Sequence, residues 1–450
     1  MKILEVNLLK DKISRSLILF ALPILISGIF QQLYNTVDTV IIGHYLGDRS
    51  LAAVGASMAV FQVIIGISQG FGNGLSIVTA RSYGAGDENL LKRSVAGSII
   101  IGLLVVVTLM IITRFFLYDM LELLRTPSEI VDEAYSYIYI ISMFISVTFM
   151  YNLLAGLYRA VGNSFMPLIF LVIASLLNIV LDLCFVIVLD MGIQGVAIAT
   201  ILAQSVSVVL SFGYLLKKMP ILIPKRVHFK IELNLYLDLF GQGLSMALMT
   251  SIVFLASIVM QYAINDMGYL IIAGHTTARR LNNLFLMPLG TLGAAISTFV
   301  SQNKGADQRQ RILEGVSYAR KLVVFWGILM TVIVYMMSSL LIRATSGSEE
   351  LLVIATGQKY MLWNAPFYFV AGVLFVSRYT LQGLGEKVLP LVSSIIELVL
   401  KIIFVAVLIP KMGYLGVVIS EPVIWFVMTV QLILSYRKND YMFGKHKDAK

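Results

Sequence analysis

Residues 168–189, LIFLVIASLLNIVLDLCFVIVL, form a stretch of 22 residues that is almost wholly apolar and is interrupted by Asn178 and Asp182. An α-helix rises ~1.5 Å per residue, so ~20 apolar residues match the ~30 Å hydrocarbon core of a bilayer. A bilayer is crossed only by helices or closed barrels, and barrel strands are alternating segments of about 10 residues. This stretch therefore predicts a membrane-spanning α-helix.

Stretches of this kind recur along the whole chain. Of the 450 residues, 58% are hydrophobic and 13% charged, whereas soluble domains carry about 25% charged residues. The sequence therefore predicts an all-α integral membrane protein in contact with the lipid bilayer. We expect twelve spans, at 17–43, 51–80, 94–121, 134–158, 167–189, 192–216, 236–264, 269–300, 317–342, 356–381, 388–409 and 413–436.

Lysine and arginine are distributed unequally between the two sides of these spans. With an even number of spans both termini share one side, and 24 of the 34 basic residues fall on that side. Because positive loops stay in the cytoplasm, the bias predicts an inner (cytoplasmic) membrane protein with both termini cytoplasmic. The net charge of +9 then reflects membrane topology, so we expect no nucleic-acid partner. Six basic residues lie on the opposite side: Arg49, Arg114, Arg125, Arg343, Lys359 and Lys411.

The two halves of the chain resemble each other. GLYRAVGNSFMP (156–167) resembles LQGLGEKVLP (381–390), and MGIQGVAIAT (191–200) resembles MGYLGVVISE (412–421). ARSYGAGD (80–87) likewise resembles SQNKGAD (301–307). Similar segments in matching order indicate an internal duplication. We therefore expect a monomer with two pseudo-symmetric six-helix lobes around a central cavity: 1–218, a cytoplasmic loop at 219–232, and 233–450.

The first half carries carboxylates at membrane depth. Asn178 and Asp182 are four residues apart and share a helical face, and Asp38 has Tyr34 one turn before it. Neither span contains a lysine or arginine that could neutralise these acids. Two carboxylates in one pocket cannot both ionise cheaply, so this pattern predicts a site for a proton or a small cation such as Na⁺. A purely structural hydrogen-bonded cluster, or exposure to a vestibule, is the alternative.

The second half lacks this pair and carries charges of both signs within its spans. Glu397 and Lys401 are four residues apart on one helix and can pair locally. Structural pairing and a role in the substrate cavity are both open interpretations of this set. Its members are Arg279, Arg280, Arg378, Glu397, Lys401 and Glu421.

The sequence contains no P-loop and no HExxH motif, its one GxSxG match, GISQG (66–70), lies inside the apolar span 51–80, and its four histidines and single cysteine are dispersed. These motifs mark nucleotide hydrolysis, zinc hydrolases and serine hydrolases. We therefore expect no enzyme activity, no resident metal and no cofactor.

Several segments, taken together, resemble the MATE (multidrug and toxic compound extrusion) family in its prokaryotic DinF-like form. They are FALPILISGIFQQLYNTVDTVIIGHYLG, SYGAGD, LYRAVGNSFMP, SLLNIVLD and SQNKGAD. The resemblance implies an antiporter that exports amphipathic, often cationic compounds in exchange for H⁺ or Na⁺. It also implies an amino-lobe cation site at Asp38, Asn178, Asp182 and Thr200 with Tyr34 nearby, and a helix hinge at Pro23.

Two departures from this resemblance keep other functions open. The seventh span has no acid between Asp238 and its end, whereas some relatives place an acidic cation site there. The basic residues Arg279, Arg280 and Arg378 are more typical of a lipid-linked oligosaccharide flippase of the same superfamily. An intramembrane enzyme or a channel is the alternative from another class.

Overall fold

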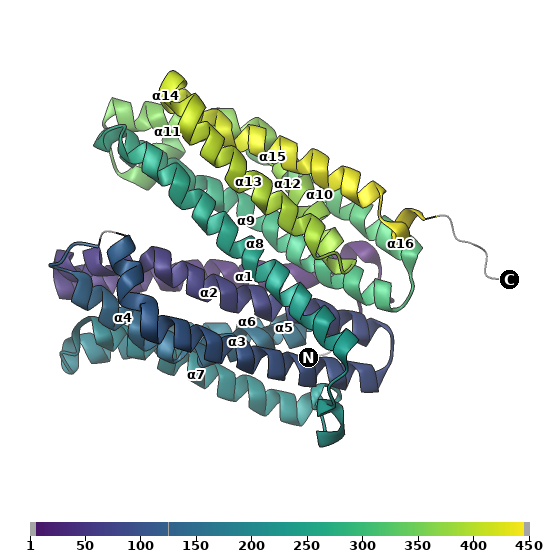
Figure 1. Cartoon of the computed structure of the whole chain (residues 1–450). Helices are drawn as coiled ribbons and strands as arrows, with labels where there is room; N and C mark the ends of the chain where they lie inside the picture. The colour runs from purple at the N-terminus through teal and green to yellow at the C-terminus, as the bar shows by residue number, and fades with distance from the viewer. Residues whose placement is uncertain (1–5, 125, 445–450) are drawn as a thin grey trace. The chain divides into compact units, whose positions relative to one another are not determined.

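The computed structural model describes residues 6–124 and 126–444, and its regular structure in these ranges consists of helices without strands (Figure 1). The basic residues predicted for the two sides at Lys2, Arg125, Lys445, Lys447 and Lys450 lie outside the described residues.

The first half contains seven α-helices and two π-helical turns among its described residues. They are α1 (Ile13–Ile41), a π-turn (Ile42–Leu46), α2 (Gly47–Gly84), α3 (Glu88–Leu123), α4 (Val131–Met143), α5 (Ile145–Ala160), α6 (Phe165–Leu183), a π-turn (Cys184–Val188) and α7 (Gly192–Lys218). Short 3-10 turns at Pro220–Leu222 and Arg226–Phe229 follow.

The second half repeats the pattern. It contains α8 (Leu233–Asn265), α9 (Tyr269–Gly305), α10 (Arg309–Ser346), α11 (Leu351–Asn364), a 3-10 turn (Ala365–Phe367), α12 (Tyr368–Gly383), α13 (Val388–Ile403), a π-turn (Phe404–Leu408), α14 (Ile409–Met412), α15 (Tyr414–Arg437) and α16 (Asp440–Phe443).

Local sequence sets several helix ends. The Asp87 carboxylate accepts a hydrogen bond from the backbone N–H of Leu90 at 3.0 Å and so caps α3. Gly347 closes α10 with φ +64°, a left-handed conformation that glycine adopts without steric cost. Helices can extend beyond the bilayer through additional turns of polar residues. For this reason α10 begins at Arg309, whereas the predicted apolar span begins at residue 317.

The expected number of spans agrees with the helices. Ten helical segments of the described chain are long and apolar enough to cross a membrane, and the bent pair α4–α5 adds an eleventh. One of the ten, Ile13–Gly84, has 72 residues and would be about 108 Å long at ~1.5 Å per residue. It must cross twice, with the break at the π-turn and at Gly47, whose φ is +80°. The result is twelve crossings.

The internal duplication is visible in the backbone. Both halves place a π-turn at the end of the equivalent helix, Cys184–Val188 after α6 and Phe404–Leu408 after α13. Gly162 and Gly385, which the sequence comparison aligned, have φ values of +91° and +83°. The same glycine turn is therefore built at the same place in each half.

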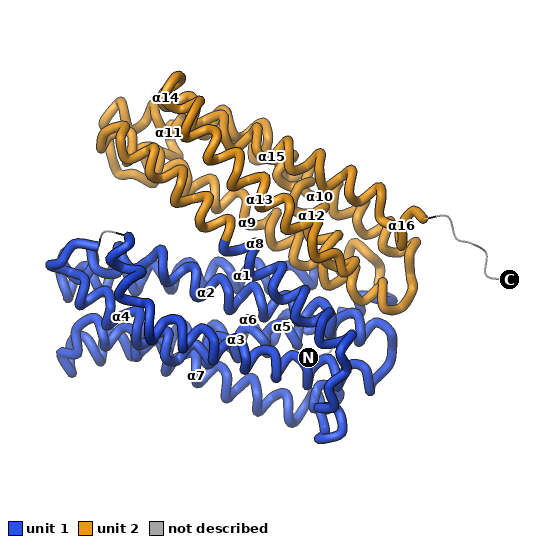
Figure 2. Tube along the Cα trace, viewed as in Figure 1, with its two compact units in different colours: residues 1–10, 19–251 blue, residues 11–18, 252–450 orange. Residues whose placement is uncertain are grey.

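The Cα trace divides into two compact units (Figure 2). One comprises residues 1–10 and 19–251, and the other comprises residues 11–18 and 252–450. The change of unit falls inside α1 and α8 and not in the loop. The predicted organisation, with lobes at 1–218 and 233–450 joined by a loop at 219–232, therefore stays a prediction.

Glycines in α2 permit very close helix packing within the first unit. A Cβ atom on Gly70 would lie 2.4 Å from the Ala247 Cα, and one on Gly74 would lie 2.4 Å from the Gln242 carbonyl oxygen. Small residues are the usual means by which membrane helices approach each other. The glycines spaced four residues apart in this span therefore serve packing of α2 against α8.

Candidate functional site

The carboxylates of the first unit lie where helices end in π-turns. Asp38 is four residues before the π-turn that follows α1, and Asp182 is two residues before the π-turn that follows α6. π-turns inside helices often mark functional sites because they redirect the side chains around them. Asp182 is fully buried and Asp38 is partly buried.

Asn178 bridges the two carboxylates. Oriented with its amide nitrogen toward them, it donates to Asp38 Oδ1 at 2.9 Å and to Asp182 Oδ2 at 3.3 Å. Its side chain is 1% exposed, so this contact is sealed inside the unit. The two carboxyl groups also lie close enough to interact electrostatically. Their mutual repulsion when both are ionised is relieved by a shared proton, or by a cation held between them.

Tyr34 and Thr200 complete this cluster from α1 and α7. The Tyr34 side chain lies close enough to Asp38 and Thr200 to interact with both. The structure thus brings together all five residues predicted for the cation site. Tyr137 of α4, which the sequence analysis missed, also lies near the two carboxylates.

The first-unit cluster has no cationic partner among the described residues. Neither Asp38 nor Asp182 forms an ion pair there. One oxygen of Asp182, Oδ1, is buried and has no hydrogen-bond partner among the residues that the structure describes. A buried carboxylate oxygen in this state is costly unless it gains a proton or a cation. The described residues contain no group of three or more His, Cys, Asp and Glu side chains suited to a resident metal.

Pro23 lies inside α1 and is buried. Proline removes one backbone hydrogen bond from the helix, and its carbonyl accepts a bond from the Ser27 hydroxyl at 2.8 Å. At ~1.5 Å per residue, Pro23 is about 22 Å from Asp38 along the helix. It therefore does not belong to the carboxylate cluster, although the change of unit at residues 18/19 lies close to it.

Three of the second-unit charges form a buried ion network. Lys401 Nζ lies 3.1 Å from Glu397 Oε1 and 3.3 Å from Glu421 Oε1. Arg279 lies near enough to Glu421 to interact electrostatically. Arg279, Lys401 and Glu421 line a small cavity, about 10 Å³ in volume. That volume is close to the space that one water molecule needs.

The remaining two charges lie apart from this cavity. Arg378 is buried, lies near Glu397, and donates from Nη2 to the Met428 sulfur at 3.4 Å. Arg280 is exposed and does not line the cavity. The six predicted charges therefore do not form a single site.

His275 and Tyr360 line the second-unit cavity and were missed in the sequence analysis. His275 is 1% exposed, and its Nδ1 lies 3.2 Å from the Tyr414 hydroxyl. The internal duplication could have identified Tyr360. Tyr360 is separated from Tyr137 by the same sequence offset that separates Lys401 from Asn178. Equivalent positions of the two halves therefore line both clusters.

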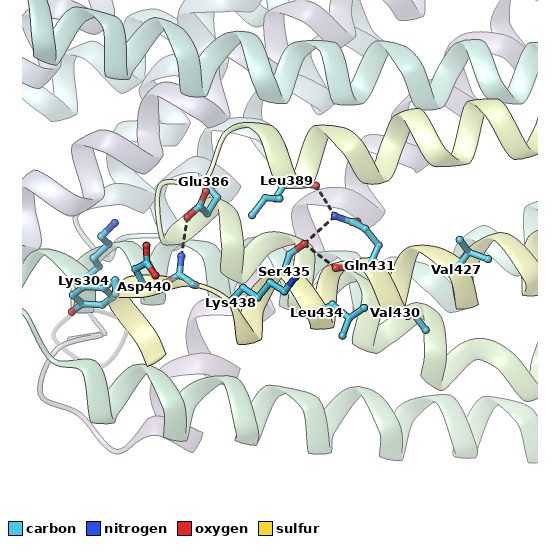
Figure 3. Close-up of a pocket in the computed structure, with 12 residues that line it drawn as sticks. Lys304, Glu386, Leu389, Val427, Val430, Gln431, Leu434, Ser435, Lys438 and Asp440 are labelled. Atoms are coloured by element: carbon cyan, nitrogen blue, oxygen red, sulfur yellow. Dashed lines mark hydrogen bonds between the residues drawn. The ribbon is translucent and has the colours of Figure 1, made fainter. Parts of the chain in front are cut away.

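A separate groove lies at the end of α15 beside α16 (Figure 3). Its polar side chains include two lysines, Lys304 and Lys438, and two acids, Glu386 and Asp440. Several are already engaged: Asn439 donates to Glu386 Oε1 at 2.8 Å, and Lys304 donates to the Leu384 carbonyl. This balanced groove is distinct from both buried clusters.

A known protein family matches both halves of the chain. The model of the MatE family matches the chain twice, over residues 23–184 and 245–407. The chain belongs to the MatE family. The two matches cover equivalent stretches of the two halves, which confirms the internal duplication. Since this family consists of transporters, the MatE chain is a multi-pass membrane transporter and not an enzyme.

Relatives of this MatE-family chain match most of its length. It is 27% identical over 449 residues to "Probable multidrug resistance protein YoeA" of Bacillus subtilis, covering 97% of this chain and 95% of the relative. It is 25% identical to "FAD transporter" of Shewanella oneidensis, covering 89% of each. The solved structure "Crystal structure of MATE in the bent conformation" matches with a TM-score of 0.89 at 23% identity, over 96% of each chain. The predicted two-lobed, twelve-helix fold is thus confirmed.

Proposed function

We propose that this chain is a cation-coupled antiporter that exports amphipathic, often cationic small molecules by alternating access, in exchange for H⁺ or Na⁺. The observation that carries the proposal is the Asp38–Asn178–Asp182 cluster, which is buried in the first unit without a cationic partner among the described residues. We also propose that the protein acts as a monomer in the inner membrane with both termini cytoplasmic.

The cluster suits a site that alternately binds and releases an ion, either H⁺ or Na⁺. With both carboxylates ionised, their repulsion opposes close approach; one proton or one Na⁺ removes most of it. An ion shifts a conformational equilibrium only if it binds the two states with different affinity. If the two carboxylates are closer together in one conformation than in the other, that conformation binds H⁺ or Na⁺ more tightly. We propose that α1 bends near Pro23 as the load changes.

Asn178 bears on which ion is used. With its amide nitrogen toward the carboxylates, Asn178 stabilises negative charge and leaves room for a shared proton. With its amide group flipped, it would present its carbonyl oxygen beside the carboxylate oxygens and the Thr200 hydroxyl. Such a set of oxygen ligands suits a hard cation such as Na⁺. Both ions are therefore chemically compatible with these residues.

The second-unit charges suit substrate selection better than ion coupling. Lys401 is already paired with two glutamates, so a further cation gains little there. The guanidinium groups of Arg279 and Arg378 would repel cationic drugs and attract anionic portions of a substrate. We propose that these charges set the substrate profile.

The test is dye efflux from vesicles that contain the purified protein, with a pH gradient and a sodium gradient imposed separately. One of the two gradients should drive export of a lipophilic dye cation. Asp38→Asn combined with Asp182→Asn should abolish gradient-driven export at normal expression, because the amides cannot cycle a proton or bind Na⁺ strongly. Export that survives this double substitution would overturn the proposal.

A second candidate is a lipid-linked oligosaccharide flippase. The basic side chains Arg279 and Arg378 inside the second unit favour it, since a pyrophosphate-linked lipid is anionic. Flipping of a fluorescent lipid-linked oligosaccharide in the same vesicles, without dye efflux under either gradient, would favour this candidate over the antiporter.

A further inference from the structure

The second unit has a groove whose charge is of one sign. About 700 Å³ in volume, it lies between α10 and the end of α15, beside α16. The side chains that line it include Arg320, Lys321, Phe325 and Ile328 of α10, Tyr436 of α15 and Phe443 of α16. Two of these side chains are basic, and no acid occurs among those described. This distinguishes it from the groove of Figure 3, where two lysines face two acids.

Arg320 is partly exposed, but part of its guanidinium group is buried. Its Nε and Nη2 atoms are buried and have no hydrogen-bond acceptor among the described residues. Its guanidinium carbon lies 5.1 Å from the centre of the Tyr436 ring. It also interacts electrostatically with another cation, Arg437. A guanidinium presents its donors as a planar fork that fits two oxygens of a phosphate. An anionic group with paired oxygens would satisfy it.

The groove lies at the depth of lipid headgroups. Arg320 and Lys321 fall in the first turns of the predicted apolar span of α10, and Tyr436 is the next-to-last residue of α15. The Tyr436 hydroxyl is likewise buried without a partner among the described residues. Basic residues near span ends reach toward the interface, and tyrosine is enriched at the same level. The polar end of the groove therefore meets the phosphate layer of a bilayer.

The apolar end of the groove continues along the surface of α10. Phe325 is 65% exposed and Ile328 is 55% exposed, and Val332 follows four residues later at 50%. Residues at this spacing lie on one face of a helix. Acyl chains can follow this face while the phosphate stays at the basic end, so a free anion would leave the apolar half unused.

We propose that this groove binds an anionic phospholipid, with the phosphate held by Arg320 and Lys321 and the acyl chains lying along Phe325 and Ile328. The site is independent of the proposed cation cluster, which lies in the other unit. Bound lipid would hold the N-terminal part of α10 against the C-terminal end of α15.

The test is lipid binding by the full-length protein purified in detergent. Native mass spectrometry and the shift in Tm compare phosphatidylglycerol with phosphatidylcholine of identical acyl chains. Because each basic residue contributes on the order of 1 kcal/mol to binding of anionic lipid, Arg320→Gln with Lys321→Gln should weaken phosphatidylglycerol binding about tenfold or more. Binding of phosphatidylcholine should not change.

The matched control is Lys438→Gln, which removes a lysine from the neighbouring groove of Figure 3 and should keep full phosphatidylglycerol binding. Arg320→Lys should be intermediate, because it keeps the charge but loses the bidentate fork. Lys321 is exposed, so Lys321→Gln alone tests the site without risk to folding. Equal binding of the two lipids, or unchanged binding in both Gln variants, would overturn the proposal. Full competition by inorganic phosphate would overturn the lipid assignment.

Discussion

At the scale of single residues, the function proposed for this chain depends on buried carboxylates that have no cationic partner among the described residues. Asp182 is fully buried with one oxygen unpartnered among the described residues, whereas Lys401 is buried with two acidic partners. An unpaired charge can gain much from a mobile ion, but a paired one can gain little. The two units therefore carry equivalent polar clusters with different chemical capacities.

Asp182→Asn should abolish export against a gradient while the protein inserts and folds nearly normally. The amide has the shape and hydrogen bonding of a protonated carboxyl group but cannot release a proton. Substrate binding should persist, which dye fluorescence quenching in detergent measures, and vesicle efflux should stop. Asn178→Ala should have a smaller effect, since a water molecule can replace one amide hydrogen bond.

Asp190→Asn is the matched control for this prediction. Asp190 follows the same helix beyond its π-turn, is exposed, and has φ +49°, a conformation that asparagine tolerates. Its efflux should equal that of the wild type. If Asp182→Asn exports dye as well as Asp190→Asn does, Asp182 has no role in coupling.

Arg279→Gln should shift the substrate profile more than Arg280→Gln does. Arg279 lines the second-unit cavity beside Glu421, whereas Arg280 is exposed outside it. Relative efflux of cationic, neutral and anionic dyes provides the measurement, and Arg279→Gln should improve export of cations. Loss of gradient dependence in Arg279→Gln would instead assign this residue to ion coupling.

At the scale of elements, the glycines of α2 allow it to pack against α8 at short range. Gly70→Leu should destabilise the first unit by about 1–3 kcal/mol or more, because its Cβ would stand 2.4 Å from the Ala247 Cα. A lower Tm in detergent and a lower yield should report the effect.

Gly55→Ala serves as the control in the same helix. A Cβ at Gly55 meets nothing within 4 Å. Alanine there should leave Tm unchanged or raise it, because it stabilises a helix by roughly 0.5–1 kcal/mol relative to glycine. Equal Tm values for Gly70→Leu and Gly55→Ala would contradict the close packing of α2 and α8.

At the scale of the whole molecule, the unequal distribution of basic residues predicts that both termini and the 219–232 loop face the cytoplasm. In a Cys184→Ser background, Val227→Cys should be protected from membrane-impermeant maleimide in intact cells. Val227 is 69% exposed, which makes it a better probe than Leu222, which is buried in the same loop. Tyr269→Cys, 79% exposed and predicted to lie outside, should react. The reverse pattern would invert the topology.

The sequence alone was sufficient for the fold class, the number of spans and the duplication. The reason is physical: hydrocarbon thickness fixes span length, and unsatisfied backbone groups exclude other structures. It also identified Asp38, Asn178 and Asp182, because a carboxylate inside an apolar span is costly enough to stand out. These residues are far apart in the chain, and their shared pocket was expected because each side chain needed a partner.

Only the tertiary structure decided how the polar groups are paired. It placed Arg280 and Arg378 outside the cavity that Lys401 lines, and it placed Tyr137 and His275 beside clusters that no motif links to them. It also revealed that two guanidinium nitrogens of Arg320, in the proposed lipid groove, are buried without a hydrogen-bond acceptor among the described residues. Tyrosine, histidine and arginine are common near span ends, so their sequence positions carry little information. Which of them find partners depends on helix rotation and packing, which contacts distant in sequence determine.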